Sequence, residues 1–271
     1  MNVSMRDAFN LGWKLAAVLR GQCAPEVLHS YSEERQKVAR MLIDFDREWS
    51  KMLGSPPRSK ADPDGVDPEE FRAYFARQQR YTAGTTIEYG PGVFRAEGRW
   101  QALAPGYPLG RRFHSAPVVR LADAKPMQLG HVVQADGRWR VIAFAGPDGA
   151  GIAALCGHLG GADSFLRRVT PNGADVDAVV DFRAVFRQGV HDVKVEDLPP
   201  ELLPRKGRFG LIDYEKAFCA DPAADIFAMR GIDPDGCIVV VRPDQHVAHV
   251  LPLDGHADLA GFFEGFLRPA G

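Results

Sequence analysis

The residues best placed to do chemistry stand at the start of the chain. The run MNVSMRDAFNLGWKLAAVLRG places a helix start beside Met1, Asn2 and Val3. A helix begins with backbone N–H groups that lack partners and with about half a positive charge, so it attracts an anion or a polarised carbonyl. Every helix has such an end, and most hold only a capping residue. The position is therefore a candidate that needs a second signal.

A glycine-rich turn is the second candidate. Gly149, Gly151 and Ala154 fit the pattern G-x-G-x-x-A between a predicted strand and a predicted helix, which is the context of a dinucleotide site. The turn is longer than such a site has, and Asp175, the acidic residue near the required spacing, stands in a turn. Nucleotide binding at Gly149 stays open as a minor alternative.

The cysteines and histidines do not indicate a redox or metal site. Four cysteines are widely spaced, with no C-x-x-C pair: Cys23, Cys156, Cys219 and Cys237. Such cysteines are typical of small buried apolar residues in a reducing cytoplasm. His246 and His249 have an odd spacing on one predicted strand and would face opposite sides. We predict no metal ligands and no catalytic residue in this chain.

Charge and hydropathy narrow the class of partner. The 33 Lys and Arg residues nearly balance the 35 Asp and Glu residues, which gives a formal net charge of -2. This balance argues against nucleic acid or an anionic membrane as the partner. The sequence contains no apolar run of about 20 residues and no basic-then-apolar start, so we expect neither a membrane span nor a secretory signal.

The first half of the chain reads as helical. Apolar residues recur at helical spacing over residues 7–20, and we expect Ser4 and Asp7 to cap that helix and Gly21 to end it. A second helix starts at Pro25 and keeps an apolar seam over residues 28–52, interrupted by Arg35. The seam suits a coiled coil, but Arg35 needs an acidic partner from elsewhere, which favours a helix lying across a larger domain. After a loop at 54–67, a short helix follows Asp67.

The second half alternates strands and helices. We predict strands over 138–146 and 174–186, a helix over 151–168, and a short strand or a turn into a helix within 209–218. Residues 236–253 read as two strands around a turn at 242–245, and a last helix begins at Asp254. This mixed order predicts a small α/β sandwich.

A family resemblance supplies the missing second signal. The opening run, followed by LHSYSEERQKVAR, resembles the end of the flavin domain in FAD-dependent aromatic hydroxylases of the phenol 2-monooxygenase and 3-hydroxybenzoate 4-monooxygenase group. Tyr31, Glu34 and Arg35 match that family's Tyr-x-x-Glu-Arg element, and YTAGTTIEYGP and GCIVVVRPDQHVAHVLPL resemble its later stretches. The resemblance implies an α/β fold in two parts. Residues 1–89 are the helical remnant of the FAD-binding domain, and residues 90–271 are a thioredoxin-like dimerisation domain.

The resemblance also implies roles. In this family the flavin ring lies against the residues that match Met1 and Asn2, and the helix dipole there stabilises negative charge by about 0.3 to 2 kcal/mol. We therefore expect Met1, Asn2 and Val3 to contact the cofactor, mainly through their main chain. The family's dinucleotide fingerprint and substrate-pocket residues belong upstream of Met1. We therefore expect FAD to bind only together with a missing upstream flavin-binding segment. The thioredoxin-like part holds GPDGAGIAAL where a redox pair would stand, so no disulfide exchange is expected.

The implied parent activity is hydroxylation of a phenol or hydroxybenzoate, with NADPH as the reductant, O2 as the oxidant and a cytoplasmic homodimer as the working form. An alternative from another class stays open. In it the chain is a stand-alone interaction module whose seam at 28–52 and Phe-rich terminal helix bind another chain without catalysis.

Overall fold

The computed structural model describes residues 2–56, 58, 65–83 and 86–270. Its α-helices are α1 (Asn2–Leu19), α2 (His29–Gly54), α3 (Pro68–Ala83), α4 (Ala150–Gly160), α5 (Phe165–Val169), α6 (Ile226–Arg230) and α7 (His256–Glu264). Short 3-10 helices are η1 (Pro25–Leu28), η2 (Gln101–Leu103), η3 (Leu129–Val132), η4 (Val195–Asp197) and η5 (Pro200–Leu202). The strands are β1 (Pro117–Arg120), β2 (Lys125–Gln128), β3 (Trp139–Phe144), β4 (Val180–Phe186), β5 (Arg205–Lys206), β6 (Leu211–Ile212), β7 (Ala217–Ala220), β8 (Cys237–Val241) and β9 (Val247–Leu251).

The strands build one sheet of seven, in the order β2-β1-β7-β4-β3-β8-β9, and a separate β5-β6 hairpin. Strands β3 and β4 are parallel and are connected through α4 and α5, whereas β8 and β9 are antiparallel and lead into α7. The order β4-β3-β8-β9 with these helices is thioredoxin-like, which confirms the expected fold class. Strands β7, β1 and β2 extend the sheet beyond β4. We call β1–β9 with α4–α7 the sheet domain.

Two apolar cores cover the two faces of the sheet. One face packs against α4, α5 and α7, and Trp13 and Ala17 of α1 join the same core. The other face packs against the chain over residues 104–133 and against α6. Helix α1 is thus part of the larger core and is not an appendage. Among the described residues, no helix is both long and apolar enough to cross a bilayer.

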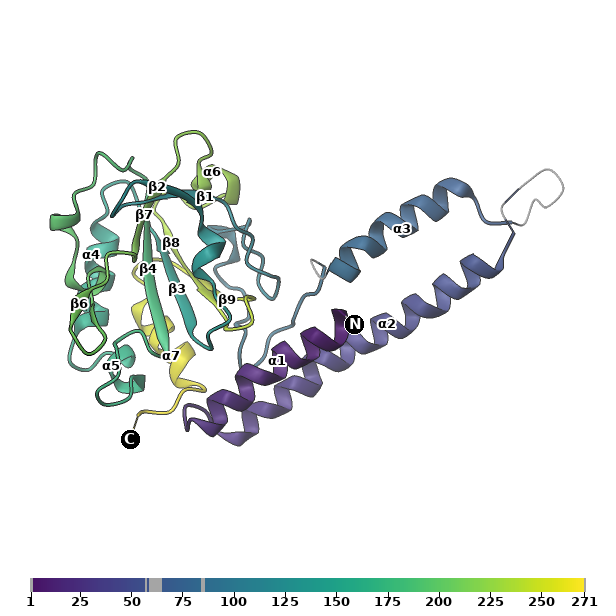
Figure 1. Cartoon of the computed structure of the whole chain (residues 1–271), viewed down its shortest axis with the longest axis horizontal. Helices are drawn as coiled ribbons and strands as arrows, with labels where there is room; N and C mark the ends of the chain where they lie inside the picture. The colour runs from purple at the N-terminus through teal and green to yellow at the C-terminus, as the bar shows by residue number, and fades with distance from the viewer. Residues whose placement is uncertain (1, 57, 59–64, 84–85, 271) are drawn as a thin grey trace.

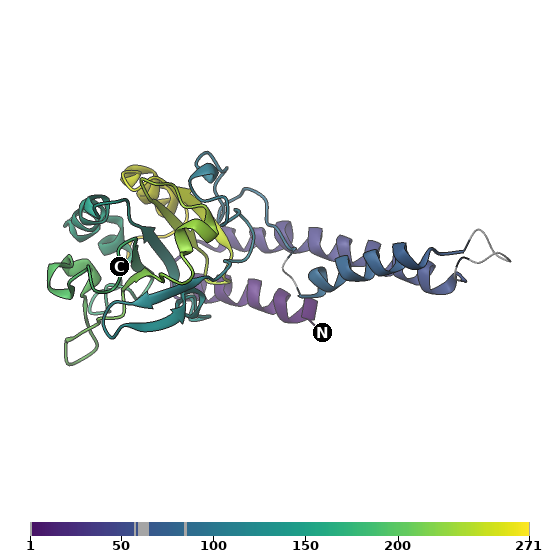
Figure 2. The ribbon, with the colours of Figure 1, turned by 90° about the horizontal axis from the view of Figure 1, so that it is seen from above.

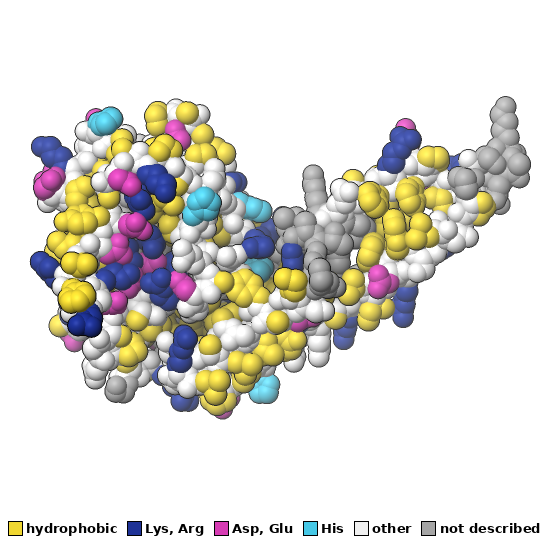
Figure 3. All heavy atoms as spheres, in the orientation of Figure 1, with side chains coloured by type: hydrophobic (Ala, Val, Ile, Leu, Met, Phe, Trp, Pro, Cys, Tyr) yellow, Lys and Arg dark blue, Asp and Glu magenta, His cyan; other side chains and the backbone are white. Residues whose placement is uncertain are grey.

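The long helices leave the sheet domain together and then project away from it (Figures 1 and 2). Helix α2 runs back beside α1, and α3 returns along the outer end of α2. The α2–α3 contact is a stack of aromatic rings, with centroid distances of 5.6 to 6.2 Å: Phe45, Trp49, Phe71, Tyr74 and Phe75. Figure 3 shows hydrophobic side chains gathered along this projection. The predicted seam therefore belongs to a long helix, of which only the first part lies against the sheet domain, as the position of Arg35 indicated. Its outer part projects away and packs on α3, which the sequence did not predict.

The capping prediction for the first helix was wrong. Helix α1 begins at Asn2, so Ser4 lies inside it and cannot cap it. Asp7 instead accepts a hydrogen bond from Nε of Arg35 at 2.6 Å, because a charge-assisted bond to a guanidinium is stronger than one to a backbone amide. This contact is the acidic partner that the sequence required for Arg35. Gly21, with φ of 72°, follows the helix end as predicted.

Two other predictions differ from the structure in detail, and two strands have no counterpart among the predictions. The helix predicted over 151–168 is two helices, because the backbone extends at Gly161 and Ser164 caps α5 by accepting from the Arg167 amide at 3.3 Å. The segment 209–218 divides into β6 and the start of β7. Strands β1 and β2 were not predicted, because each has only four residues and follows no strict alternation.

Candidate cofactor-facing site

The first turn of α1 is the predicted cofactor site. Met1 lies outside the described residues, and Asn2 and Val3 form the start of α1. Residues 2–5 include no acidic side chain, so nothing in this turn neutralises the positive end of the helix. In the same turn, the Met5 side chain is 63% exposed. Free main-chain donors beside an exposed apolar side chain fit a flat ring with polar edges, so this turn is compatible with the flavin of FAD.

A buried ionic cluster fixes α1 to the sheet domain; we call it the seam network. Its members are Asn10 and Lys14 on α1, Glu34 on α2, and Arg242 and Asp244 in the turn between β8 and β9. The Arg242 guanidinium donates to both oxygens of Glu34, from Nη1 at 2.6 Å and from Nη2 at 2.9 Å. It also binds Asp244, from Nε at 2.9 Å and from Nη2 at 2.7 Å. Residues from three distant parts of the sequence meet here.

The two α1 residues complete the seam network. Nζ of Lys14 lies 2.8 Å from Oε2 of Glu34, and Nδ2 of Asn10 donates to the same oxygen at 2.7 Å and to Oδ2 of Asp244 at 3.3 Å. Two carboxylates thus face two cations, so the cluster is neutral overall. Sequence reasoning matched Glu34 to a family element but missed its partners, because Arg242 follows it by 208 residues.

Burial and charge act against each other at this seam. Burial lowers the pKa of Lys14 to about 8, although Glu34 pulls it upward. Burial also opposes ionisation of Glu34 and Asp244, but the Arg242 guanidinium outweighs it and holds the pKa of both carboxyls below their usual range. The carboxylates therefore stay ionised, and Lys14 is the member whose charge is easiest to remove.

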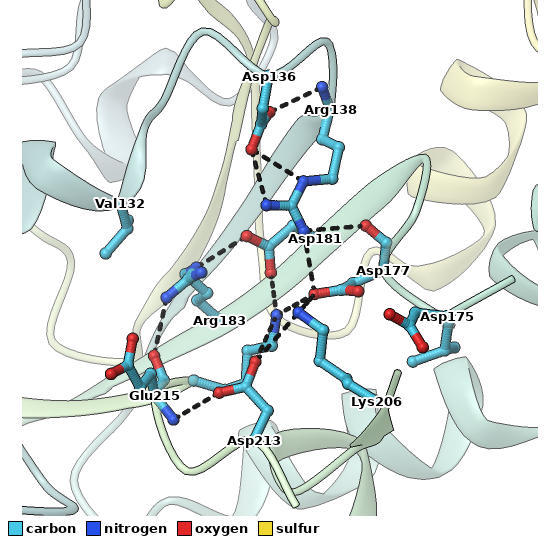
Figure 4. Close-up of polar contacts among 12 residues, drawn as sticks. Val132, Asp136, Arg138, Asp175, Asp177, Asp181, Arg183, Lys206, Asp213 and Glu215 are labelled. Atoms are coloured by element: carbon cyan, nitrogen blue, oxygen red, sulfur yellow. Dashed lines mark hydrogen bonds and ion pairs between the residues drawn. The ribbon is translucent and has the colours of Figure 1, made fainter. Parts of the chain in front are cut away.

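A second buried network lies where β3 and β4 begin (Figure 4). Figure 4 labels Asp181 of β4 at the centre of this network. Asp181 lies between Arg140, whose Nε is 3.0 Å from Oδ2, and Lys216, whose Nζ is 2.6 Å from Oδ1. Asp177 contacts both Lys216 and Lys206. Burial opposes ionisation of Asp177, but the two lysines lower its pKa to about 2. Opposite charges are paired throughout, so this cluster has the character of a structural network.

The remaining candidates do not form a catalytic site. All four cysteines are free and buried, and burial raises the pKa of each thiol, to about 11 for Cys23 and Cys219 and to about 12 for Cys156 and Cys237. The described residues contain no cluster of three or more His, Cys, Asp or Glu side chains that could hold a metal ion.

The histidine and glycine-turn predictions can be placed in the same way. His246 precedes β9 and packs on the Tyr89 ring at 4.5 Å, whereas His249 lies on β9 and packs on the Phe262 ring at 5.2 Å. The two therefore do not share one strand as predicted, but they do lie in different surroundings. At the Gly149 turn, the Asp148 carboxylate accepts from the amide of Ala150 at 3.0 Å. That places negative charge where a phosphate would bind, which argues against a nucleotide there.

The fold and the seam define an α/β protein in which a thioredoxin-like domain is joined to an N-terminal helix pair. Residues 87–271 match the family model described as phenol hydroxylase, C-terminal dimerisation domain, and residues 1–46 match the FAD binding domain. The chain belongs to the phenol hydroxylase C-terminal dimerisation domain family.

Curated relatives cover nearly the whole chain. It is 56% identical to 3-hydroxybenzoate 4-monooxygenase of Comamonas testosteroni over 99% of its length, and 34% identical to the FAD-dependent monooxygenase terD of Aspergillus terreus over 100%. It spans 43% and 46% of the length of these two relatives. Solved structures share the fold: the flavin-dependent monooxygenase PieE and aklavinone-11 hydroxylase each give a TM-score of 0.53 at 19% identity. They cover 96% and 97% of this chain, which corresponds to 43% and 39% of theirs.

Proposed function

We propose that the chain is the C-terminal part of a FAD-dependent monooxygenase that hydroxylates a phenol or hydroxybenzoate ring with NAD(P)H and O2. The observation that carries the proposal is 56% identity over 99% of the chain to an enzyme named for that reaction. FAD would accept electrons from NADPH and activate O2. This chain would supply main-chain contacts to the flavin and hold them in place, while the upstream segment would carry the substrate pocket.

The proposed flavin contacts are Met1, Asn2 and Val3. The match of residues 1–46 to the FAD-binding domain and the absence of acid in the first turn of α1 support this role. Oriented N–H donors at a helix start stabilise negative charge on a reduced ring without reorganising. Carboxylate in the same turn should oppose that effect.

The experiment joins the upstream part of the Comamonas testosteroni relative to Met1 and purifies the hybrid. The expected result is a yellow protein that oxidises NADPH faster when 3-hydroxybenzoate is added. Val3→Asp should lower the affinity for FAD about tenfold, which corresponds to about 1.4 kcal/mol. Leu19→Asp, at the 85% exposed far end of α1, is the matched control and should bind FAD normally.

A colourless hybrid without phenol-dependent NADPH oxidation would refute the proposed monooxygenase function and would favour the interaction module. The module predicts association of the chain but neither of these signals.

The proposal extends to the organisation of the protein. The division between FAD-binding and dimerisation parts falls near Tyr89, giving residues 1–89 and 90–271, and is supported by the limits of the two family matches. A homodimer in the cytoplasm is supported by the family's description as a dimerisation domain and by four buried free thiols. Light scattering after size-exclusion chromatography should give twice the mass of 29.7 kDa for the chain.

A further inference from the structure

The seam network gives α1 two polar anchor points. Asn10 and Lys14 are four residues apart, so their side chains lie on one face of the helix, one turn from each other. They are 1% and 0% exposed. Both contact Glu34, which Arg242 holds, and Asn10 also donates directly to Asp244. A continuous set of bonds therefore runs from α1 to the turn between β8 and β9.

Two contacts fix motions of α1 that a single contact leaves free. A helix held at one residue can roll about its axis or tilt around that point. Two contacts separated by about 6 Å along the axis define the roll and the axial position together. The bidentate geometry of Arg242 on Glu34 adds direction, because a planar fork matches a carboxylate in few orientations.

The apolar contacts of α1 do a different job. Trp13 packs against Phe94 at 4.7 Å and against Trp139 at 5.7 Å between ring centroids, within the larger core. Such apolar contacts stabilise the fold but tolerate small shifts of the helix. Buried ion pairs add little stability compared with apolar side chains of the same shape, but they require a defined geometry. Trp13 therefore holds α1 on the sheet domain, and the seam network fixes the orientation of the helix.

The orientation fixed at Asn10 reaches the start of α1. Residues 2–10 contain neither glycine nor proline, and they form continuous helix of about 12 Å. A short, uninterrupted helix behaves as a rigid rod, so a change of roll at Asn10 turns the first-turn N–H groups by the same angle.

We propose that Arg242 and Asp244 are positioning residues for the first turn of α1, acting through Glu34 and Asn10. They belong to the β8–β9 turn near the end of the chain, so the sheet domain takes part in shaping the flavin site without touching the flavin. This inference rests on the proposed function.

Amide hydrogen exchange on the chain itself tests the mechanical part. Arg242→Met keeps the length of the side chain but removes its bonds to Glu34 and Asp244, and should speed exchange over residues 6–14 about tenfold relative to α4, which contains neither substituted residue. Asn10→Leu removes the bonds from Asn10 to Glu34 and Asp244 but leaves Arg242 and Lys14 in place, and should change the same residues in the same direction, by less. The matched control is Arg140→Met, since Arg140 is equally buried and paired with carboxylates, but with Asp136 and Asp181 of the sheet domain.

Arg140→Met should leave the ratio of α1 exchange to α4 exchange unchanged, because it lies on β3 and belongs to neither helix. If Arg242→Met and Asn10→Leu also leave that ratio unchanged, the inference is overturned.

The flavin part is tested on the hybrid loaded with FAD, by its visible spectrum and its flavin midpoint potential. Both should shift in Arg242→Met and stay at the wild-type values in Arg140→Met. A wild-type hybrid that binds no FAD rejects the proposed function. A wild-type hybrid that binds FAD, with an Arg242→Met form of identical spectrum and potential, rejects the inference alone.

Discussion

Glu34 accepts two hydrogen bonds from the Arg242 guanidinium, at 2.6 and 2.9 Å, although 208 residues separate the two in the chain. The pair closes the seam between the helix pair and the sheet domain, and it is enclosed by Lys14 and Asp244.

Removing the charge of Glu34 should therefore destabilise the protein. Glu34→Gln leaves Arg242 and Lys14 with one buried carboxylate, Asp244, in place of two. We expect a loss of about 3 kcal/mol in the free energy of unfolding, measured by urea denaturation. Glu33→Gln, its exposed neighbour, is the control and should stay within about 0.5 kcal/mol of wild type. Equal effects of the two substitutions would contradict the role given to the pair.

Lys14 should make stability rise with alkaline pH. Its pKa is about 8 in the folded protein and has an ordinary value of 10.5. Between pH 8 and pH 10.5, Lys14 is more often protonated in the unfolded chain than in the folded protein. Raising the pH through this range therefore increases the free energy of unfolding, by about 3 kcal/mol in total. The thiols titrate in the opposite sense, so the comparison is with Lys14→Met. From pH 8 to pH 10, the free energy of unfolding of the wild type should increase relative to that of Lys14→Met. A constant difference between the two free energies would refute this prediction.

Asp177 should make stability fall in acid. Its folded pKa of about 2 lies below the ordinary 3.8, so its contribution is complete above pH 3.8 and is lost as the pH falls through 2. The gap in unfolding free energy between wild type and Asp177→Asn should therefore narrow from pH 5 to pH 2. A gap that stays constant over this range in urea titrations would contradict the role given to Asp177.

Gly110 should tolerate no side chain. Its φ is 78°, and a Cβ atom there would lie 2.1 Å from the Tyr89 carbonyl oxygen. Gly110→Ala should lower the free energy of unfolding by more than about 4 kcal/mol, because backbone must move. Gly173 has a φ of 75° with open space around it, so Gly173→Ala isolates the conformational cost of about 1 kcal/mol. Thermal unfolding of both variants would separate the cost of the steric clash at Gly110 from the cost of a positive φ alone.

Local patterns in the sequence predicted the three N-terminal helices, the last helix and the β8–β9 turn well. Proline at the second turn position and the alternating valines on either side act locally, and the Gln245 amide does donate to the Arg242 carbonyl at 2.9 Å. The sequence indicated that Arg35 needs an acidic partner but could not identify it, because tertiary packing brings Asp7 to Arg35.

Patterns do not reveal buried charge. Asp181 and Arg183 alternate with apolar residues on β4, as residues on a solvated face do, yet Asp181 is fully buried beneath Lys216 and Arg140. Alternation reports which face of a strand a residue occupies. It does not report what covers that face, and the covering lysine comes from a strand connection 35 residues later.

The four shielded thiols have a practical consequence for anyone handling the protein. Each stays protonated at neutral pH and out of reach of solvent, so the protein should keep in air without added reductant. A single cysteine introduced at exposed Leu53 would then be the one site that a maleimide dye labels, and the projecting helices could be followed by fluorescence against a silent background.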